Sequence, residues 1–161
     1  FCNKPIITLV HGAVIGGGNG ITAASDIVLA EKDTVFAFSE VKLGITPATI
    51  SPFVIARCGE MPARELMLSG RKFTAQEAMN YKLVNFVGDI DELNHRLDFF
   101  IDNFLQASPD AIRDCKHLIR GVCGRSNPYD SIFQTTAMMI AQERMSEDGQ
   151  KRMKEFLEKK R

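Results

Sequence analysis

The sequence lacks an excess of charge of either sign, because 20 lysine and arginine residues balance 20 aspartate and glutamate residues. This balance argues against a general nucleic-acid binder, which needs a basic surface. No apolar run approaches the roughly 18 residues that a membrane-spanning helix requires, so we expect no membrane partner. The 161 residues, of which 45% are hydrophobic and 25% charged, have the length and composition of one ordinary globular domain.

Clusters of metal-binding residues are also missing. The four cysteines contain no CxxC pair, which indicates buried thiols in a reducing compartment and leaves disulfides or zinc without support. The histidines do not lie near aspartate or cysteine at ligand spacing, and we interpret all of them as structural: His11, His95 and His117. We therefore predict no metal site.

The most informative stretch runs from Val10 to Phe38. A short, mostly β-branched run at 6–10 predicts a buried strand, and Gly16–Gly18 precede a helix of small residues at 21–24. Glycines leave their N–H groups uncovered by any Cβ, and at a helix start the unpaired N–H groups and the positive end of the dipole point the same way. This pattern predicts a site for an anion or a developing oxyanion. On composition alone, a tight turn or close helix–strand packing explains the glycines equally well.

Two nucleotide-binding motifs are excluded by the spacing of the glycines. The sequence contains no GxxxxGK[ST], which argues against a phosphate-binding P-loop. The pattern GxGxxG occurs only imperfectly, and no acidic residue closes a second strand as dinucleotide-binding folds require.

Glu40 is the candidate acid–base residue. It lies in FAFSEVKLG, at the start of a loop expected over 39–52, with Phe38 and Val41 nearby. Apolar surroundings disfavour a charged carboxylate and raise its pKa, which suits proton transfer near neutral pH. The residues alone leave open a solvated glutamate or one paired with Lys42.

Apolar periodicity predicts an α/β core followed by a helical second half. The expected strands are 6–10, 26–30, 35–38 and 83–87. Helical segments are expected at 53–58 and 63–68, interrupted by Gly59 and Pro62, and the apolar period becomes helical throughout from Asp91 onward.

Capping patterns mark the helix starts. Thr74 and Glu77 form a capping box that opens a short helix. Ser108-Pro109 and Asn127-Pro128 each place a cap before a proline at the first helical position. The last helix is expected over Gln150–Arg161.

Several separately spaced motifs resemble the enoyl-CoA hydratase/isomerase (crotonase) superfamily: HGAVIGGGNGITAASDIVLA, FAFSEVKLGITP and LMLSGRKFTAQEAMNYKLVNFV. The resemblance implies an α/β fold, a crotonase-like spiral of ββα units, partial over residues 1–90. Residues 91–161 are then a helical region for oligomerisation and coenzyme A contact. The family's N-terminal portion is not covered. Because the chain enters a core strand soon after Phe1, the residues also lead us to expect neighbouring strands from earlier sequence.

The resemblance assigns roles to individual residues. Gly17 matches the glycine whose N–H binds the thioester oxygen in an oxyanion hole, and the second donor of that hole belongs to the uncovered portion. Glu40 matches a glutamate that gives or takes a proton at the acyl chain. The remaining positions implied in substrate binding are Gly16, Gly18, Asn19, Gly20 and Pro47.

Three of these assignments have alternatives. Asn19 is expected to bind a water or a substrate carboxyl, or to cap the helix start. Phe156 and Lys159 resemble a Phe-x-x-Lys motif that reaches the adenine and phosphate end of coenzyme A. A solvated helix end, with lysines favourable to the helix dipole, explains the same residues.

Gly20 departs from the family pattern. Two-glutamate hydratases carry a glutamate at this position, and a glycine cannot perform acid–base chemistry. Two branches of the family that this chain resembles tolerate a single glutamate, at the position of Glu40. They are the Δ3-Δ2-enoyl-CoA isomerases and a bacterial group that resembles methylglutaconyl-CoA hydratases. The segment SEVKLGITPATISPFV, with Pro47-Ala48-Thr49, is more similar to the second.

The expected function is therefore that of a lyase, a hydratase-like enzyme that adds water to a 2-enoyl-CoA in acyl-CoA catabolism. The alternatives are an isomerase and a non-catalytic acyl-CoA-binding homologue. The resemblance implies a coenzyme A thioester as substrate with no further cofactor, a homotrimer or hexamer, and a cytoplasmic location (mitochondrial or peroxisomal in a eukaryote).

Overall fold

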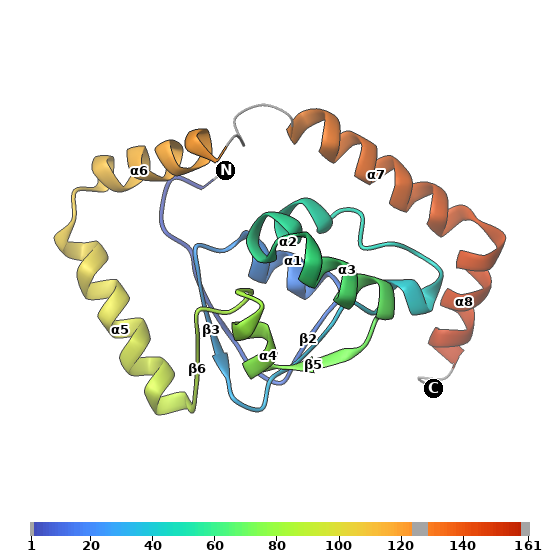
Figure 1. Ribbon diagram of the computed structural model, residues 1–161, viewed down its shortest axis with the longest axis horizontal. Coiled ribbons are helices and arrows are strands. Elements are labelled where there is room, and N and C mark those ends of the chain that lie inside the picture. Colours follow the sequence, from blue (N-terminus) through green and yellow to red (C-terminus); the bar gives the residue numbers. More distant parts are fainter. Residues whose placement is uncertain (1, 124–128, 159–161) are drawn as a thin grey trace.

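The computed structural model describes residues 2–123 and 129–158 (Figure 1). Short strands alternate with helices up to residue 88, and only helices follow. The first part contains β1 (Ile7–Val10), β2 (Ala13–Ile15), α1 (Gly17–Ala24), β3 (Ile27–Glu31), β4 (Val35–Ala37), the 3₁₀ helix η1 (Ser39–Leu43), α2 (Ser51–Cys58), α3 (Glu60–Ser69), β5 (Lys72–Thr74), α4 (Ala75–Asn80) and β6 (Phe86–Gly88). The second part contains α5 (Ile90–Gln106), α6 (Pro109–Val122), α7 (Tyr129–Met145) and α8 (Glu147–Glu158).

The strands form two three-stranded sheets, with the orders β1-β3-β6 and β2-β4-β5. All pairs are parallel except β4 with β5. The first four strands alternate between the sheets, since β1 and β3 lie in one while β2 and β4 lie in the other, and β5 then pairs with β4. The pairs β1–β2 and β3–β4 are each followed by helix, so the chain repeats a ββα unit, and in the third pair α4 lies between β5 and β6. This arrangement confirms the expected α/β spiral of ββα units.

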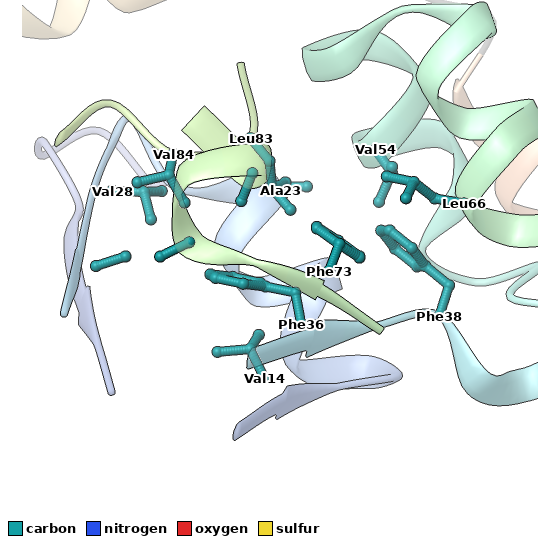
Figure 2. Close-up of a cluster of buried hydrophobic side chains, with 13 residues drawn as sticks. Val14, Ala23, Val28, Phe36, Phe38, Val54, Leu66, Phe73, Leu83 and Val84 are labelled. Atoms are coloured by element: carbon teal, nitrogen blue, oxygen red, sulfur yellow. The ribbon is translucent and has the colours of Figure 1, made fainter. Parts of the chain in front are cut away.

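Three phenylalanines form the centre of the core. Phe36 lies on β4, and Phe38 directly follows that strand. Both rings stack on Phe73 of β5, with ring centroids 5.5 and 5.9 Å from its own. All three rings are almost fully buried, and Figure 2 shows Val54 of α2 and Leu66 of α3 close to Phe38. Burying a side chain of this size contributes about 1.5–3 kcal/mol, so this cluster holds β4 rigidly where the chain turns into η1.

Local pattern predicted most helices but missed short elements. The structure contains β2 and β5, which the sequence analysis did not predict, because three residues are too few to show a strand's alternation. It also contains η1, within the expected loop at 39–52. Pro62 does not interrupt α3, since it lies in the first turn, where a missing N–H is tolerated. The chain at 83–87 forms a strand only from Phe86, and α8 begins before Gln150.

The capping predictions are confirmed where the structure describes them. The Thr74 hydroxyl accepts from the Glu77 N–H while the Glu77 carboxylate accepts from the Thr74 N–H. The Ser108 hydroxyl accepts from the Ala111 N–H and so opens α6. The expected cap at 127–128 lies outside the described residues.

The C-terminal helices extend on both sides of the core. Figure 1 shows α5 and α6 on one side, and α7 and α8 on the other. The α5 helix packs on β3 and β6 and buries Leu93 completely. Large apolar side chains on these helices remain exposed: Phe99, Leu105, Leu118, Ile119, Met138, Met145 and Leu157. Within the described ranges, none of the helices has the length and hydropathy needed to cross a membrane.

Arg57 of α2 links three separate segments. Its guanidinium donates to the Leu83 carbonyl at 2.8 Å, to the Asn85 side-chain oxygen at 2.6 Å and to the Ser25 carbonyl at the end of α1. The same Asn85 oxygen accepts from the Val28 N–H of β3 at 2.8 Å. One half-buried side chain therefore satisfies one acceptor at the end of α1 and two acceptors in the loop before β6.

We expect Arg57→Met in the native polypeptide to lower the free energy of unfolding by about 2–4 kcal/mol, because it leaves several acceptors unsatisfied. Arg64→Met is the matched control: Arg64 pairs with Glu60 across one turn of α3, and its side chain is 65% exposed. That variant should lose less than about 0.5 kcal/mol. Urea denaturation measures both, and similar losses would show that Arg57 is no more than a surface residue.

Candidate active site

The candidate site begins where β2 passes into α1. The Gly16 N–H donates to the Ala37 carbonyl of β4 at 3.0 Å, which continues the β2–β4 pairing by one bond. Gly16 then turns with φ 55° and ψ −118° and caps α1. This backbone conformation is accessible to glycine and costly for other residues. The turn lets the helix start directly at the end of the strand.

The next two N–H groups are the ones available for a ligand. Gly17 and Gly18 occupy the first two positions of α1, where an α-helix provides no acceptor. Among the described residues, neither N–H has a hydrogen-bond partner, and a Cβ on Gly17 would meet nothing within 4 Å. The Gly17 N–H therefore lies without an acceptor from the described residues at the positive end of a helix dipole, where a developing oxyanion would be stabilised.

The Glu40 carboxyl lies against this glycine turn. A Cβ built on Gly16 would be 3.3 Å from Glu40 Oε1 and 3.7 Å from Glu40 Cδ. The glycine thus permits a carboxyl group to approach the backbone beside Gly17. Glu40 itself belongs to η1, which ends at Gly44 in a left-handed conformation whose N–H donates back to the Glu40 and Val41 carbonyls.

The electrostatics of Glu40 agree with the sequence prediction. Burial raises the pKa of its carboxyl above the ordinary value of 4.5, and a hydrogen bond to its own backbone N–H opposes this only in part. Its Oε2 atom is enclosed and finds no hydrogen-bond partner among the described residues. A carboxyl with an unsatisfied oxygen is readily protonated and can return that proton.

Asn19 plays a different part from the helix cap that we considered. The cap is Gly16, and Asn19 is completely buried. Its amide donates to the Val14 carbonyl at 3.2 Å and to the Ala37 carbonyl at 2.8 Å, so it ties α1 to both β2 and β4. The side-chain oxygen has no partner within the described chain. Its expected role in binding water or substrate stays a prediction. No local pattern reveals the tie, because it depends on the pairing of distant strands.

Gly20 faces the side chain of Ile50. A Cβ on Gly20 would lie 2.3 Å from Ile50 Cγ2 and 2.9 Å from Ile50 Cβ. These distances are far shorter than any van der Waals contact, so position 20 accepts no side chain while Ile50 stays in place. The sequence showed that position 20 has no carboxylate, but the contact of Gly20 with Ile50 could not be predicted from it. Apolar periodicity does not indicate which loop residue packs against which helix.

The loop from Glu40 to Ile50 is held at two points. Pro47 is buried and its carbonyl accepts from the N–H groups of Ile50 and Ser51, at 3.2 and 2.9 Å, which starts α2. Thr46 donates both its N–H and its hydroxyl to one carboxylate oxygen of Glu143 on α7, at 2.6 and 2.9 Å. The expected role of Pro47 in substrate binding stays a prediction.

The proposed coenzyme A residues lie at the end of the chain. Phe156 lies on α8 and is 43% exposed, and α8 packs beside η1, which carries Glu40. Lys159 lies outside the described residues. In the described ranges 2–123 and 129–158, no group of three or more His, Cys, Asp or Glu side chains is arranged to hold a metal ion.

A helix N-terminus beside a half-buried carboxyl, on a core of ββα units, defines the chain as an α/β protein of crotonase-like fold. A family model described as enoyl-CoA hydratase/isomerase matches residues 1–161. The chain belongs to the enoyl-CoA hydratase/isomerase family.

Individual relatives agree with this family. The chain is 33% identical over 150 residues to the enoyl-CoA hydratase AKT6-1 of Alternaria alternata, covering 92% of this chain and 50% of that protein. It superimposes on an enoyl-CoA hydratase/isomerase of Pseudoalteromonas atlantica T6c with a TM-score of 0.88 and 27% identity, covering 98% of this chain and 63% of the other. An enoyl-CoA hydratase of Shewanella pealeana gives a TM-score of 0.72 at 37% identity, with coverage of 98% and 58%. The chain thus spans between half and two thirds of the length of these proteins.

The glycine turn yields a matched pair of variants. Gly16→Ala should lower the free energy of unfolding by about 1–3 kcal/mol, because alanine strains at this φ and ψ and its Cβ would crowd Glu40. Gly17→Ala should change it by less than about 0.5 kcal/mol, since Gly17 is helical with open space around it and alanine favours a helix. Denaturation of both variants tests this order, and a Gly17 variant as unstable as the Gly16 variant would contradict the geometry.

The pKa of Glu40 predicts a specific dependence of stability on pH. Because the folded-state pKa is raised, the carboxyl favours folding fully below its unfolded pKa and loses that contribution as pH rises through the folded pKa. Glu40→Gln should therefore gain stability relative to the wild type between about pH 4 and pH 7.

Glu77→Gln is the control of opposite sign. A hydrogen bond from the Thr74 N–H is the main cause that lowers the pKa of the Glu77 carboxyl, and a hydrogen bond from Arg71 is the next. The contribution of this carboxylate to folding stability is therefore present above its unfolded pKa and is lost in acid. Relative to the wild type, this variant should lose stability over the same pH interval. Urea denaturation at about pH 4 and pH 7 measures how the stability of each variant, relative to the wild type, changes with pH. A change of the same sign in both variants would refute the raised pKa of Glu40.

Proposed function

We propose that the chain carries the acid–base half of an acyl-CoA site and acts as a hydratase-like lyase on a 2-enoyl-CoA thioester. The observation that supports this is the contact of the Glu40 carboxyl with Gly16, directly beside the unpaired Gly17 N–H. A proton carrier and an oxyanion donor are thereby brought within a few ångströms of each other. These two functions are what chemistry through a thioester enolate requires.

Water addition uses the two groups in sequence. The Glu40 carboxylate takes a proton from water as the water oxygen bonds to the β-carbon, and the double-bond electrons move onto the thioester oxygen. The Gly17 N–H stabilises that developing enolate; one such donor is typically worth about 2.7–4 kcal/mol. The protonated Glu40 then gives its proton to the α-carbon as the carbonyl re-forms. Glu40 ends as a carboxylate, and one water has been added.

An isomerase is the second candidate, and the contact between Gly20 and Ile50 favours it. With position 20 closed to a side chain, Glu40 is the carboxylate at this turn of α1. One carboxylate suffices to remove a proton from the α-carbon of a 3-enoyl-CoA and return it to the γ-carbon through the same enolate. A chain that binds acyl-CoA without turnover is the third candidate.

We propose two further contacts for the assembled enzyme. The exposed apolar side chains of α5 to α8 support a homotrimer or hexamer, since exposed apolar surface of this extent marks protein contacts. The position of α8 beside η1 supports contact of Phe156 with the coenzyme A portion of the substrate. The mass of the assembly in solution, measured by light scattering, tests the first of these.

We expect Glu40→Gln to lower turnover at least about a hundredfold while leaving the affinity for coenzyme A nearly unchanged, because glutamine keeps the shape of the side chain but its amide cannot act as an acid or a base. The native polypeptide is assayed with crotonyl-CoA, 3-methylglutaconyl-CoA and a 3-enoyl-CoA. Loss of the 2-enoyl thioester absorbance on either of the first two identifies a hydratase, and its appearance from the third identifies an isomerase.

The matched control is Glu60→Gln, at an exposed residue of α3 away from the glycine turn, which should keep full turnover. Unchanged turnover in the Glu40 variant would remove Glu40 from the mechanism. A wild-type protein without activity on all three compounds, yet with affinity for coenzyme A, would indicate the non-catalytic binder.

A further inference from the structure

A single loop lines the first turn of α1 at two glycines. At the start of the loop, the Glu40 carboxyl lies against Gly16, and at its end, the Ile50 side chain lies against Gly20. Four residues of an α-helix advance about 6 Å along its axis, so Gly20 lies one turn beyond the carboxyl. A longer acidic side chain at position 20 would extend toward the loop that carries Glu40. Position 20 is thus the place on α1 where a second carboxylate could approach the same substrate.

Ile50 blocks this place with atoms that cannot easily move. The clashes of a Cβ at position 20 are with Cγ2 and Cβ of Ile50, at 2.3 and 2.9 Å, and its Cα is 3.9 Å away. A β-branched side chain is stiff at χ1. The backbone is also held, since the Ile50 N–H donates to the Pro47 carbonyl and the Ile50 carbonyl accepts from the N–H groups of Phe53 and Val54.

The side chain is also part of the packing of the domain. Ile50 is partly buried against the hydrophobic core, and it directly precedes α2, which packs on α1. Moving Ile50 away from Gly20 would therefore open a gap in that packing. The apolar side chain of Ile50 thus packs against Gly20, a helix position without a side chain. Gly20 lies one turn beyond the Glu40 carboxyl, which is itself poorly solvated.

We propose that Ile50 is a specificity-determining residue that restricts the site to one carboxylate, by closing position 20 of α1 and placing a methyl group where a second acid–base group would stand. This inference rests on the proposed function and deepens it. The wall leaves Glu40 to perform each proton transfer and gives an attacking water no second carboxylate to orient it. A carboxylate can then be added at position 20 only when the Ile50 side chain is made smaller.

The first test requires no activity. Gly20→Ala should lower Tm by about 4 °C or more, because its Cβ has no space. In the Ile50→Ala background, the same change should leave Tm unchanged or raise it, since alanine favours a helix and the space is now open. The control is Gly121→Ala on α6, where a Cβ meets nothing within 4 Å, and it should give the same small effect in both backgrounds. An equal loss from Gly20→Ala in both backgrounds would overturn the role of Ile50.

The second test is chemical. Gly20→Glu combined with Ile50→Ala should hydrate crotonyl-CoA at least tenfold faster than Ile50→Ala alone, whereas Gly20→Glu with Ile50 present should give no gain. A gain from Gly20→Glu alone, with Tm unchanged, would overturn the proposal, as would a folded double variant with no gain. A wild-type protein without turnover would instead refute the proposed function, and the reversal in Tm would still decide whether Ile50 closes position 20.

Discussion

The arrangement of the site depends on one carbonyl group, that of Ala37 at the end of β4. It accepts from the Gly16 N–H at 3.0 Å and from the Asn19 amide at 2.8 Å, and so fixes the start of α1 against the end of β4. Because the Gly16 N–H is used in this way, Gly17 is the first residue of the helix whose N–H is left for a ligand. Because β4 ends there, Glu40 follows three residues later and meets Gly16. The donor and the carboxyl are thus placed by the same hydrogen-bonded junction.

This junction has a cost that the core offsets. It needs a backbone conformation that favours glycine, together with one oxygen of the fully buried Asn19 and one of the Glu40 carboxyl that find no partner in the part of the chain that the structure describes. Each of these is unfavourable by itself. The stacked rings of Phe36, Phe38 and Phe73 lie on the same strand pair and hold it in place. The unfavourable groups lie together at the predicted site, as is common where strain and poor solvation serve chemistry.

What the sequence could predict was local. The glycine run, the apolar neighbours of Glu40 and the Thr74–Glu77 capping box are short-range features, and the structure confirms the helix start, the raised pKa and the cap. The tie made by Asn19 and the wall made by Ile50 could not be predicted, because each depends on residues that are far apart in the chain. The strands β2 and β5 were not predicted for a related reason. Each forms by pairing with β4, and three residues are too few to show an alternating pattern of their own.

The loop between Glu40 and Ile50 connects the site to the C-terminal helices. One carboxylate oxygen of Glu143 on α7 accepts both bonds from Thr46, which lies between Glu40 and Ile50 in the chain. Exposed methionines, Met138 and Met145, lie on the same helix. A subunit that packed on α7 would act on a helix already bonded to the loop of the site. Under the proposed assembly, a contact on α7 would therefore reach the loop that carries Glu40 and Ile50 through the Glu143 side chain.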